Sequence, residues 1–207
     1  QNDWNQIKQA AEGAHFLLYR GHGIYDGKTP PQTVGGFGLK GKYASSKDIV
    51  ADLKLAPGAI VMLYGCFTAG NSGFDIGKID EKEAMRRVAM YSEPFIELNT
   101  SGYYANWFPD AFAVFLANLF AGQNLGDAYK NYSDFDAKTV TYSKHPRKTD
   151  RAMWIDHDNW NGRLAFNNAF VGMPERRLID LFPASGDVVP APAGEAEFEF
   201  LERRKKK

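Results

Sequence analysis

The alternation of apolar runs with glycine-rich breaks predicts two neighbouring strands of a parallel sheet. The runs cover residues 15–20 and 59–64, and both are apolar at nearly every position. Between them, Ser45 and Asp48 form a capping-box pattern ahead of apolar positions at helical spacing. Strand, helix and strand in this order are typical of a parallel βαβ unit, whose strands are covered on both faces. The sequence therefore predicts an α/β fold.

Capping residues, apolar runs and breakers predict the remaining elements. Asp3 is a candidate N-cap for a short helix ending at Gly13, and Asp80 for a helix that continues to Tyr91. Apolar periodicity predicts helices at 109–121 and 124–132 and strands at 94–99 and 164–172. The polar region 139–163 is expected to form a surface loop.

Composition predicts one domain and excludes several classes of partner. The expected domain covers residues 1–182, and the Pro/Ala/Gly-rich and then charged sequence of 183–207 predicts a linker or charged tail. Lys plus Arg and Asp plus Glu number 25 each, so no net charge attracts nucleic acid. The longest apolar stretch is too short to span a membrane. The many Asn and Tyr residues and the Pro/Ala tail favour an exported protein.

The strongest chemical signal is a histidine and a cysteine that each follow an apolar run. His22 lies between Gly21 and Gly23, and Cys66 is the single cysteine of the chain. Parallel neighbouring strands would bring His22 and Cys66 to one edge of the sheet, and a thiol beside an imidazole suits nucleophilic catalysis. His15 would lie at the opposite edge. The two other histidines are expected to be solvated loop residues: His145 and His157.

Residue spacing excludes two known motifs, a dinucleotide-binding loop and the nucleophile elbow of α/β-hydrolases. Gly21, Gly23 and Gly27 approach a dinucleotide-binding loop, but the last glycine comes one residue late and two prolines follow. A hydrolase nucleophile elbow needs glycine two residues before and after Cys66, where the chain has Tyr64 and Thr68.

A calcium-loop pattern near the end of the domain is also imperfect. Asp156 and Asp158 precede Asn159, Asn161 and Gly162. The glycine falls at position seven of the loop rather than at position six, where the sharp turn of such a loop requires it. A polar turn is therefore expected here.

The residues around the His–Cys pair resemble the caspase-like (clan CD) cysteine peptidases, most closely those of the CHAT, gingipain and clostripain type. The shared pattern is a strand ending in His22-Gly23, a glycine-rich loop, a short helix containing Asp48-Ile49 and a strand ending in Gly65-Cys66. This similarity covers residues 14–73. The segment Val171-Gly172-Met173-Pro174 weakly resembles the Gly-Asp-Pro segment of gingipain-type enzymes. The resemblance implies a caspase-like three-layer sandwich, a mainly parallel sheet with helices on both faces.

The resemblance also implies a catalytic mechanism. Cys66 would be the nucleophile and His22 the general acid–base, with the backbone N–H groups of Gly23 and Cys66 as the oxyanion hole. No cofactor is implied, although calcium activation is known among such enzymes. The residue that binds a basic substrate side chain in clostripain-type enzymes is replaced by Tyr64. Asp48 and Asp75 are candidate substrate-binding residues instead.

The resemblance finally implies that the histidine strand has a further neighbouring strand. Two strands normally precede the histidine strand in these peptidases, whereas only one short helix does here. Without such a neighbour the apolar run 15–20 would be an exposed sheet edge. We therefore expect an N-terminal segment or a second chain to complete the sheet, with proteolytic processing as its source. The alternative function is a non-catalytic caspase-like interaction or assembly module with a vestigial dyad. A thiol hydrolase that uses His145 or His157 is disfavoured by the missing elbow glycines.

Overall fold

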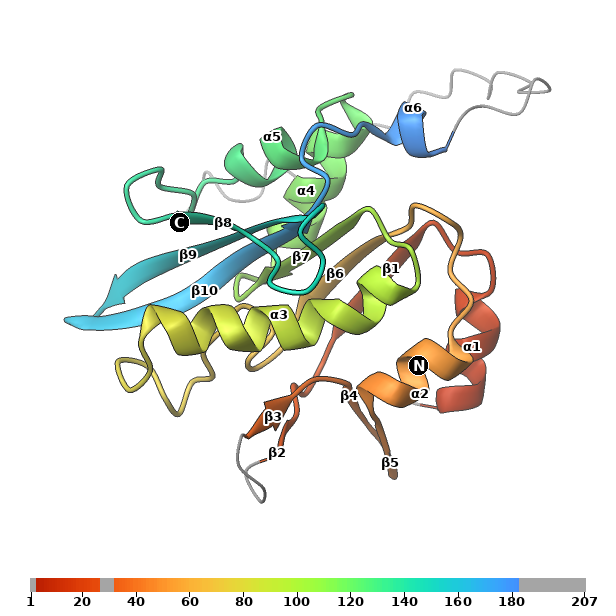
Figure 1. Cartoon of the computed structure of the whole chain (residues 1–207), viewed down its shortest axis with the longest axis horizontal. Coiled ribbons are helices and arrows are strands. Elements are labelled where there is room, and N and C mark those ends of the chain that lie inside the picture. The colour runs from red at the N-terminus through yellow and green to blue at the C-terminus, as the bar shows by residue number, and fades with distance from the viewer. Residues whose placement is uncertain (1–2, 27–31, 183–207) are drawn as a thin grey trace, which may run out of the picture.

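The computed structural model describes residues 3–26 and 32–182, so the predicted tail at 183–207 lies outside the described residues. A six-stranded sheet in the order β1-β6-β7-β10-β9-β8 forms its centre (Figure 1). The helices are α1 (Trp4–Ala11), α2 (Ser46–Asp52), α3 (Glu81–Glu97), α4 (Ala111–Phe120), α5 (Leu125–Lys130) and α6 (Leu178–Leu181). The sheet strands are β1 (Phe16–Arg20), β6 (Ile60–Tyr64), β7 (Gly102–Asn106), β8 (Thr141–Lys144), β9 (Ala152–Trp160) and β10 (Arg163–Gly172). Two small antiparallel pairs join β2 (Tyr25–Asp26) to β3 (Thr33–Val34) and β4 (Phe37–Leu39) to β5 (Lys42–Ala44).

The predicted βαβ unit is confirmed. Strands β1 and β6 are parallel neighbours, and α2 lies between them in the chain. The capping box of Ser45 and Asp48 is present at the start of α2. The side chains of Asp3 and Asp80 likewise accept hydrogen bonds from the first turns of α1 and α3. Local capping chemistry therefore fixed where these three helices begin.

The sheet is mixed, and the prediction of a mainly parallel sheet was wrong. The pairs β1–β6 and β6–β7 are parallel, whereas β7–β10, β10–β9 and β9–β8 are antiparallel. The region 139–163, expected to be a loop, supplies β8 and β9. Its turn residues Asn161 and Gly162 have φ angles of +52° and +77°, as a two-residue hairpin turn requires. The predicted polar turn is confirmed, but it joins two long strands.

The third strand of the sheet was placed one element too early. Residues 94–99 were predicted to be a strand, but α3 continues through Pro94 to Glu97. The reason is that Val88, Tyr91 and Phe95 are buried at helical spacing, so the apolar period of the helix does not end at Tyr91. The strand β7 follows this helix instead, and all of its residues are buried.

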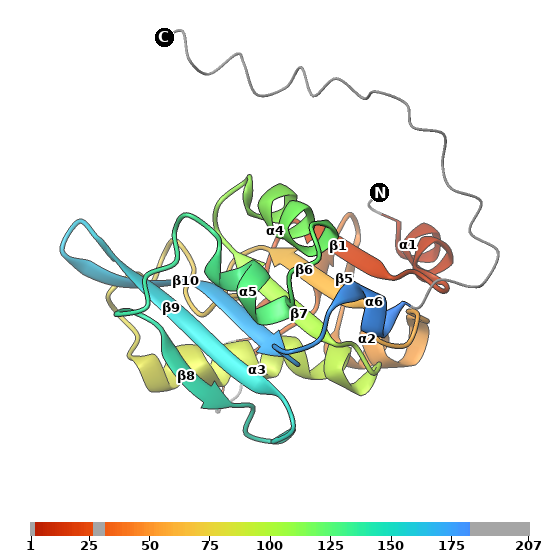
Figure 2. The same cartoon turned by 90° about the horizontal axis from the view of Figure 1, so that it is seen from above.

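Helices cover both faces of the sheet, with α1, α2 and α3 on one face and α4, α5 and α6 on the other (Figure 2). Strand β6 is fully enclosed, because Val61 and Leu63 pack into one hydrophobic cluster while Ile60 and Met62 pack into the other. Strand β1 is only partly enclosed and forms the edge of the described sheet. No helix within the described ranges is long and apolar enough to cross a membrane.

Candidate active site

The structure brings the candidate dyad to one edge of the sheet. In the parallel register of β1 and β6, Arg20 lies beside Tyr64. The ladder continues beyond both strands, because the N–H of Gly21 donates to the carbonyl oxygen of Tyr64 over 3.0 Å. His22 and Cys66 each follow two residues after these strand ends. The main chain therefore places them side by side at the carboxyl ends of the two strands.

Gly23 and Cys66 touch through their main chains. A Cβ on Gly23 would lie 1.7 Å from the carbonyl oxygen and 2.9 Å from the backbone nitrogen of Cys66. A Cβ on Gly65 would likewise lie 2.9 Å from the carbonyl oxygen of Gly21. Only glycine permits such an approach of two backbones. Gly23 and Gly65, which flank the dyad residues, are thus required by packing of the main chain at the site.

Two backbone N–H groups at this contact are free. Within the described ranges, the N–H groups of Gly23 and Cys66 have no hydrogen-bond acceptor. The next amide along the chain is engaged, because Phe67 donates its N–H to the carbonyl oxygen of Asn71 over 2.7 Å. Paired free N–H groups beside a thiol are the donors that an oxyanion hole needs.

The chain turns sharply directly after Cys66. Phe67 has a φ of +68°, a left-handed conformation that is strained for an aromatic residue. The turn is held from both sides: the Thr68 hydroxyl donates to the carbonyl oxygen of Gly65 over 2.8 Å, and the Tyr103 hydroxyl donates to the carbonyl oxygen of Thr68 over 2.7 Å. This turn leaves Cys66 partly exposed at the end of an otherwise buried strand.

A buried arginine on α3 supports the loop that follows the cysteine. Arg87 donates to Asp75 over 2.5 Å and to Glu83 over 2.8 Å. Its guanidinium carbon lies 5.4 Å from the ring centre of Phe67 and 5.5 Å from that of Tyr25, and these two rings stack on each other. Burial opposes ionisation of Asp75, but hydrogen bonds, that from Arg87 foremost, hold its pKa below the usual value. Arg87 was missed by sequence reasoning because nothing in the helix pattern of α3 distinguishes it from Arg86.

His22 is exposed, while its main chain is fixed. Its carbonyl oxygen accepts hydrogen bonds from the Tyr19 hydroxyl over 3.0 Å and from the Gly38 N–H over 3.2 Å. A cleft of about 760 Å³ opens beside it, lined by the end of β1 and by β4, with Arg20 and Lys40 among its residues. In the structure as described, no direct hydrogen bond joins the His22 ring to the Cys66 thiol. Catalytic hydrogen bonds often tighten only when substrate binds.

The two candidate substrate-binding carboxylates are both engaged in structural contacts. Asp48 caps α2 through Ser45 and lies 3.5 Å from the Lys42 ammonium group. Asp75 is bound by Arg87, as described above. Among the described residues, no hydrogen bond or ion pair connects either carboxylate to the dyad. Their roles in substrate binding stay predictions.

The prediction that His145 is a solvated loop residue was wrong. His145 is fully buried, with Nε2 lying 3.1 Å from the Ala89 carbonyl oxygen. Its Nδ1 accepts hydrogen bonds from the N–H groups of Arg147 and Lys148. Burial lowers its pKa. The residue thus anchors the turn between β8 and β9 to α3, away from the dyad.

His157 and His15 lie apart from the dyad as well. His157 is a partly exposed residue of β9, and His15 precedes β1, where its ring lies 4.3 Å from that of Phe182. Among the described residues, no group of three or more His, Cys, Asp or Glu side chains could hold a metal ion. No protein-family model, curated protein or solved structure matches the chain.

Proposed function

We propose that this protein is a cysteine endopeptidase of the caspase-like type, with Cys66 as nucleophile and His22 as general acid–base. One observation carries the proposal: Gly23 packs directly on the main chain of Cys66, and neither residue's N–H group has an acceptor among the described residues. A histidine, a cysteine and two free donors at the ends of adjacent parallel strands are the parts that acyl transfer from a peptide needs.

The proposed reaction proceeds in two steps. The Cys66 sulfur attacks the peptide carbonyl carbon and forms a thioester as the C–N bond breaks, while His22 delivers the thiol proton to the leaving amine. The free N–H groups of Gly23 and Cys66 bind the oxyanion of each tetrahedral intermediate. A water molecule then attacks the thioester, His22 accepts its proton, and the thiol is regenerated together with the new carboxylate.

The architecture supports the finer assignment to a caspase-like sandwich. Helices cover both faces of the sheet, the candidate histidine and cysteine follow adjacent parallel strands, and an antiparallel strand lies next to β7. The substrate in this proposal is a peptide or protein, bound across the cleft beside His22. The open edge of β1 also supports the expected additional strand from outside the described residues.

Covalent labelling tests the proposal against a non-catalytic module. Wild type, Cys66→Ala and His22→Ala are treated with iodoacetamide and with a peptidyl acyloxymethyl ketone at neutral pH, and intact mass gives the rate. His157→Ala serves as the matched control, because that histidine is distant from the dyad along the sheet. Fast modification of Cys66 that requires His22 is expected. Slow modification that is indifferent to His22 would favour an interaction or assembly module, and dependence on His157 would favour a different thiol hydrolase.

A further inference from the structure

An arginine beside the candidate dyad has a fixed orientation but no anionic partner. Arg20 is the last residue of β1, and its partner in the parallel register is Tyr64, the last residue of β6. The guanidinium carbon of Arg20 lies 4.7 Å from the centre of the Tyr64 ring. Among the described residues, the Arg20 side chain takes part in no hydrogen bond or ion pair. Stacking therefore orients this cation without neutralising it.

The stacked position leaves the donors of the guanidinium available. A guanidinium carries five N–H donors in its plane, and an aromatic ring that faces this plane uses none of them as a hydrogen-bond partner. Two parallel donors match the two oxygens of a carboxylate. Arg20 is exposed at the end of its strand, so a ligand can reach it. These are the properties of a carboxylate-binding residue.

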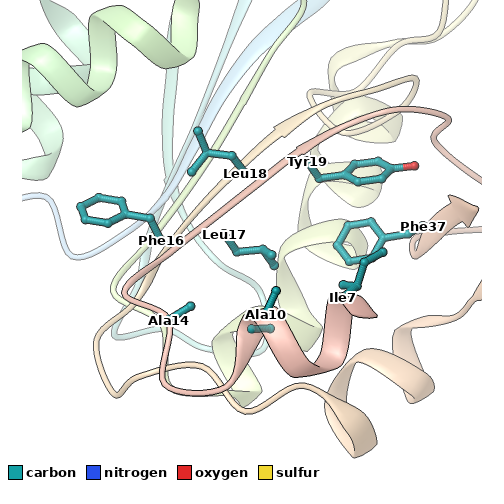
Figure 3. Close-up of a pocket in the computed structure, with 9 residues that line it drawn as sticks. Ile7, Ala10, Ala14, Phe16, Leu17, Leu18, Tyr19 and Phe37 are labelled. Carbon is teal, nitrogen blue, oxygen red and sulfur yellow. The ribbon is translucent and has the colours of Figure 1, made fainter. Parts of the chain in front are cut away.

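Arg20 is also separate from the contacts that hold the main chain of His22. Figure 3 shows the side chains of Leu18 and Tyr19 on opposite sides of β1. The Tyr19 hydroxyl turns back to the His22 carbonyl oxygen, to which it donates over 3.0 Å. Because side chains alternate along a strand, Arg20 extends on the Leu18 side instead. Its charge is therefore not used to hold the histidine in place.

The cleft beside His22 is positively charged. Arg20 and Lys40 line this cleft of about 760 Å³ together with His22, and no carboxylate is among its described lining residues. Lys40 is exposed in the turn between β4 and β5, and it too has no ion-pair partner in the described part of the chain. The whole chain has 25 Lys plus Arg and 25 Asp plus Glu residues, so this positive charge is local to the cleft.

The role of His22 indicates which part of a peptide would occupy the cleft. In the proposed reaction, His22 delivers a proton to the leaving amine. This amine belongs to the residue that follows the scissile bond, so that residue and the next one lie on the His22 side of the site. Arg20 precedes His22 by two residues, and two residues span about 7 Å of main chain at most. The guanidinium is thus close enough to contact side chains in these positions.

We propose that the cleft beside His22 is a subsite for an acidic side chain of the substrate, in the first or second position after the scissile bond. Arg20, oriented by Tyr64, binds the carboxylate, and Lys40 adds positive charge from the β4 side of the cleft. This inference rests on the proposed peptidase function. It names the substrate class as peptides with Glu or Asp after the cleaved bond.

Peptides that differ only in charge test the subsite. A peptide that wild type cleaves is resynthesised with Glu, Gln or Lys in the first two positions after the scissile bond, and kcat/KM is measured for each. We expect wild type to cleave the Glu peptide with a kcat/KM about tenfold higher than the Gln peptide, as hydrogen bonds between charged groups allow. The Lys peptide should be cleaved most slowly.

Variants of the cleft separate recognition of charge from loss of structure. Arg20→Glu should reverse the order of the Glu and Lys peptides, and a gain in kcat/KM for the Lys peptide cannot come from misfolding. Arg20→Gln should make the Glu and Gln peptides nearly equal. The matched control is Lys47→Glu, which makes the same change of charge at an exposed residue of α2 outside the cleft. This control should keep the wild-type order.

Three results would overturn the subsite while leaving the peptidase function intact. Equal kcat/KM for all three peptides in wild type would mean that the cleft does not select charge. A preference that Arg20→Glu leaves unchanged would assign the selection to another residue. A requirement for an acidic residue before the scissile bond would place recognition on the other side of the dyad. Absence of any cleavage by wild type would instead contradict the peptidase function, and this subsite with it.

Discussion

Gly23 lies so close to Cys66 that a Cβ on Gly23 would come 1.7 Å from the Cys66 carbonyl oxygen. The residue after the candidate general base is thus in direct contact with the candidate nucleophile. Strand pairing brings two segments to the same edge of a sheet, but this contact fixes their separation. Both residues also keep N–H groups that have no acceptor among the described residues, as donors for a developing oxyanion must.

Replacing Gly23 with alanine should separate the two segments. We expect inactivation by a peptidyl acyloxymethyl ketone to slow by about 100-fold, because the donors lose their alignment. The added methyl group should lower the free energy of unfolding by about 1–3 kcal/mol. Gly73→Ala is the control, since a Cβ there meets nothing within 4 Å. Equal inactivation rates in the two variants would show that the contact has no role at the site.

Replacing Arg87 or its neighbour Arg86 tests whether Arg87 supports the loop after Cys66. The Arg87 side chain is 5% exposed and neutralises Asp75 and Glu83, whereas the Arg86 side chain is 33% exposed. Arg87→Met should lower the free energy of unfolding by about 3–5 kcal/mol, because it leaves the partly buried Asp75 carboxylate without its ion-pair partner, whereas Glu83 keeps its contact with Arg86. Arg86→Met should cost less than about 1 kcal/mol. Urea unfolding measures both, and similar costs would contradict the role of Arg87.

His145 should make stability fall on the acid side of neutrality. Burial lowers the pKa of His145 in the folded chain, whereas the unfolded chain keeps the ordinary value of about 6.5. Below that pH the unfolded chain therefore binds a proton at His145 more readily than the folded chain does. The free energy of unfolding of wild type should therefore decrease as pH falls below that value. His145→Gln should be less stable than wild type at neutral pH, with a gap that narrows on acidification. A gap independent of pH would show that His145 does not titrate in this way.

Asp134 should make stability fall as pH rises, which is opposite to the effect of His145. Burial, together with the charges of Asp158 and Asp156, raises its pKa to about 7. Between about pH 4 and pH 7 the folded chain holds a proton that the unfolded chain has lost, so stability falls as pH rises through this window. Asp134→Asn should therefore gain about 1–2 kcal/mol over wild type above neutrality and little at acidic pH, after allowance for solvent screening. Denaturant unfolding at both ends of the window measures the difference, and an equal gain at both would contradict it.

The parts of the fold that follow from local sequence were predictable. The Asp3, Ser45 and Asp80 caps marked helix starts, and two apolar runs predicted the parallel pair that carries His22 and Cys66. The predicted strand at 164–172 is present as β10, but β8, β9 and the antiparallel pairing were missed because Asn161-Gly162 was compared with a calcium loop rather than with a hairpin turn.

Other features of the site and of the fold depend on contacts that no local pattern contains. Arg87 reaches Asp75 from a different element, and the buried His145, away from the site, contacts the carbonyl oxygen of Ala89 on α3. The conformation of Phe67 is also set from a distance, by Tyr25 and Tyr103. These relationships become visible only when the chain is folded, because each joins residues far apart in sequence.

Hydrolysis of a peptide mixture tests the central claim most directly. Purified wild type, Cys66→Ala and His22→Ala are incubated with the same mixture, and mass spectrometry identifies new chain ends. We predict internal cleavage by wild type, with none above background in either variant. Absence of cleavage by wild type, or the same cleavage by Cys66→Ala, would contradict the assignment of Cys66 and His22 as a peptidase dyad.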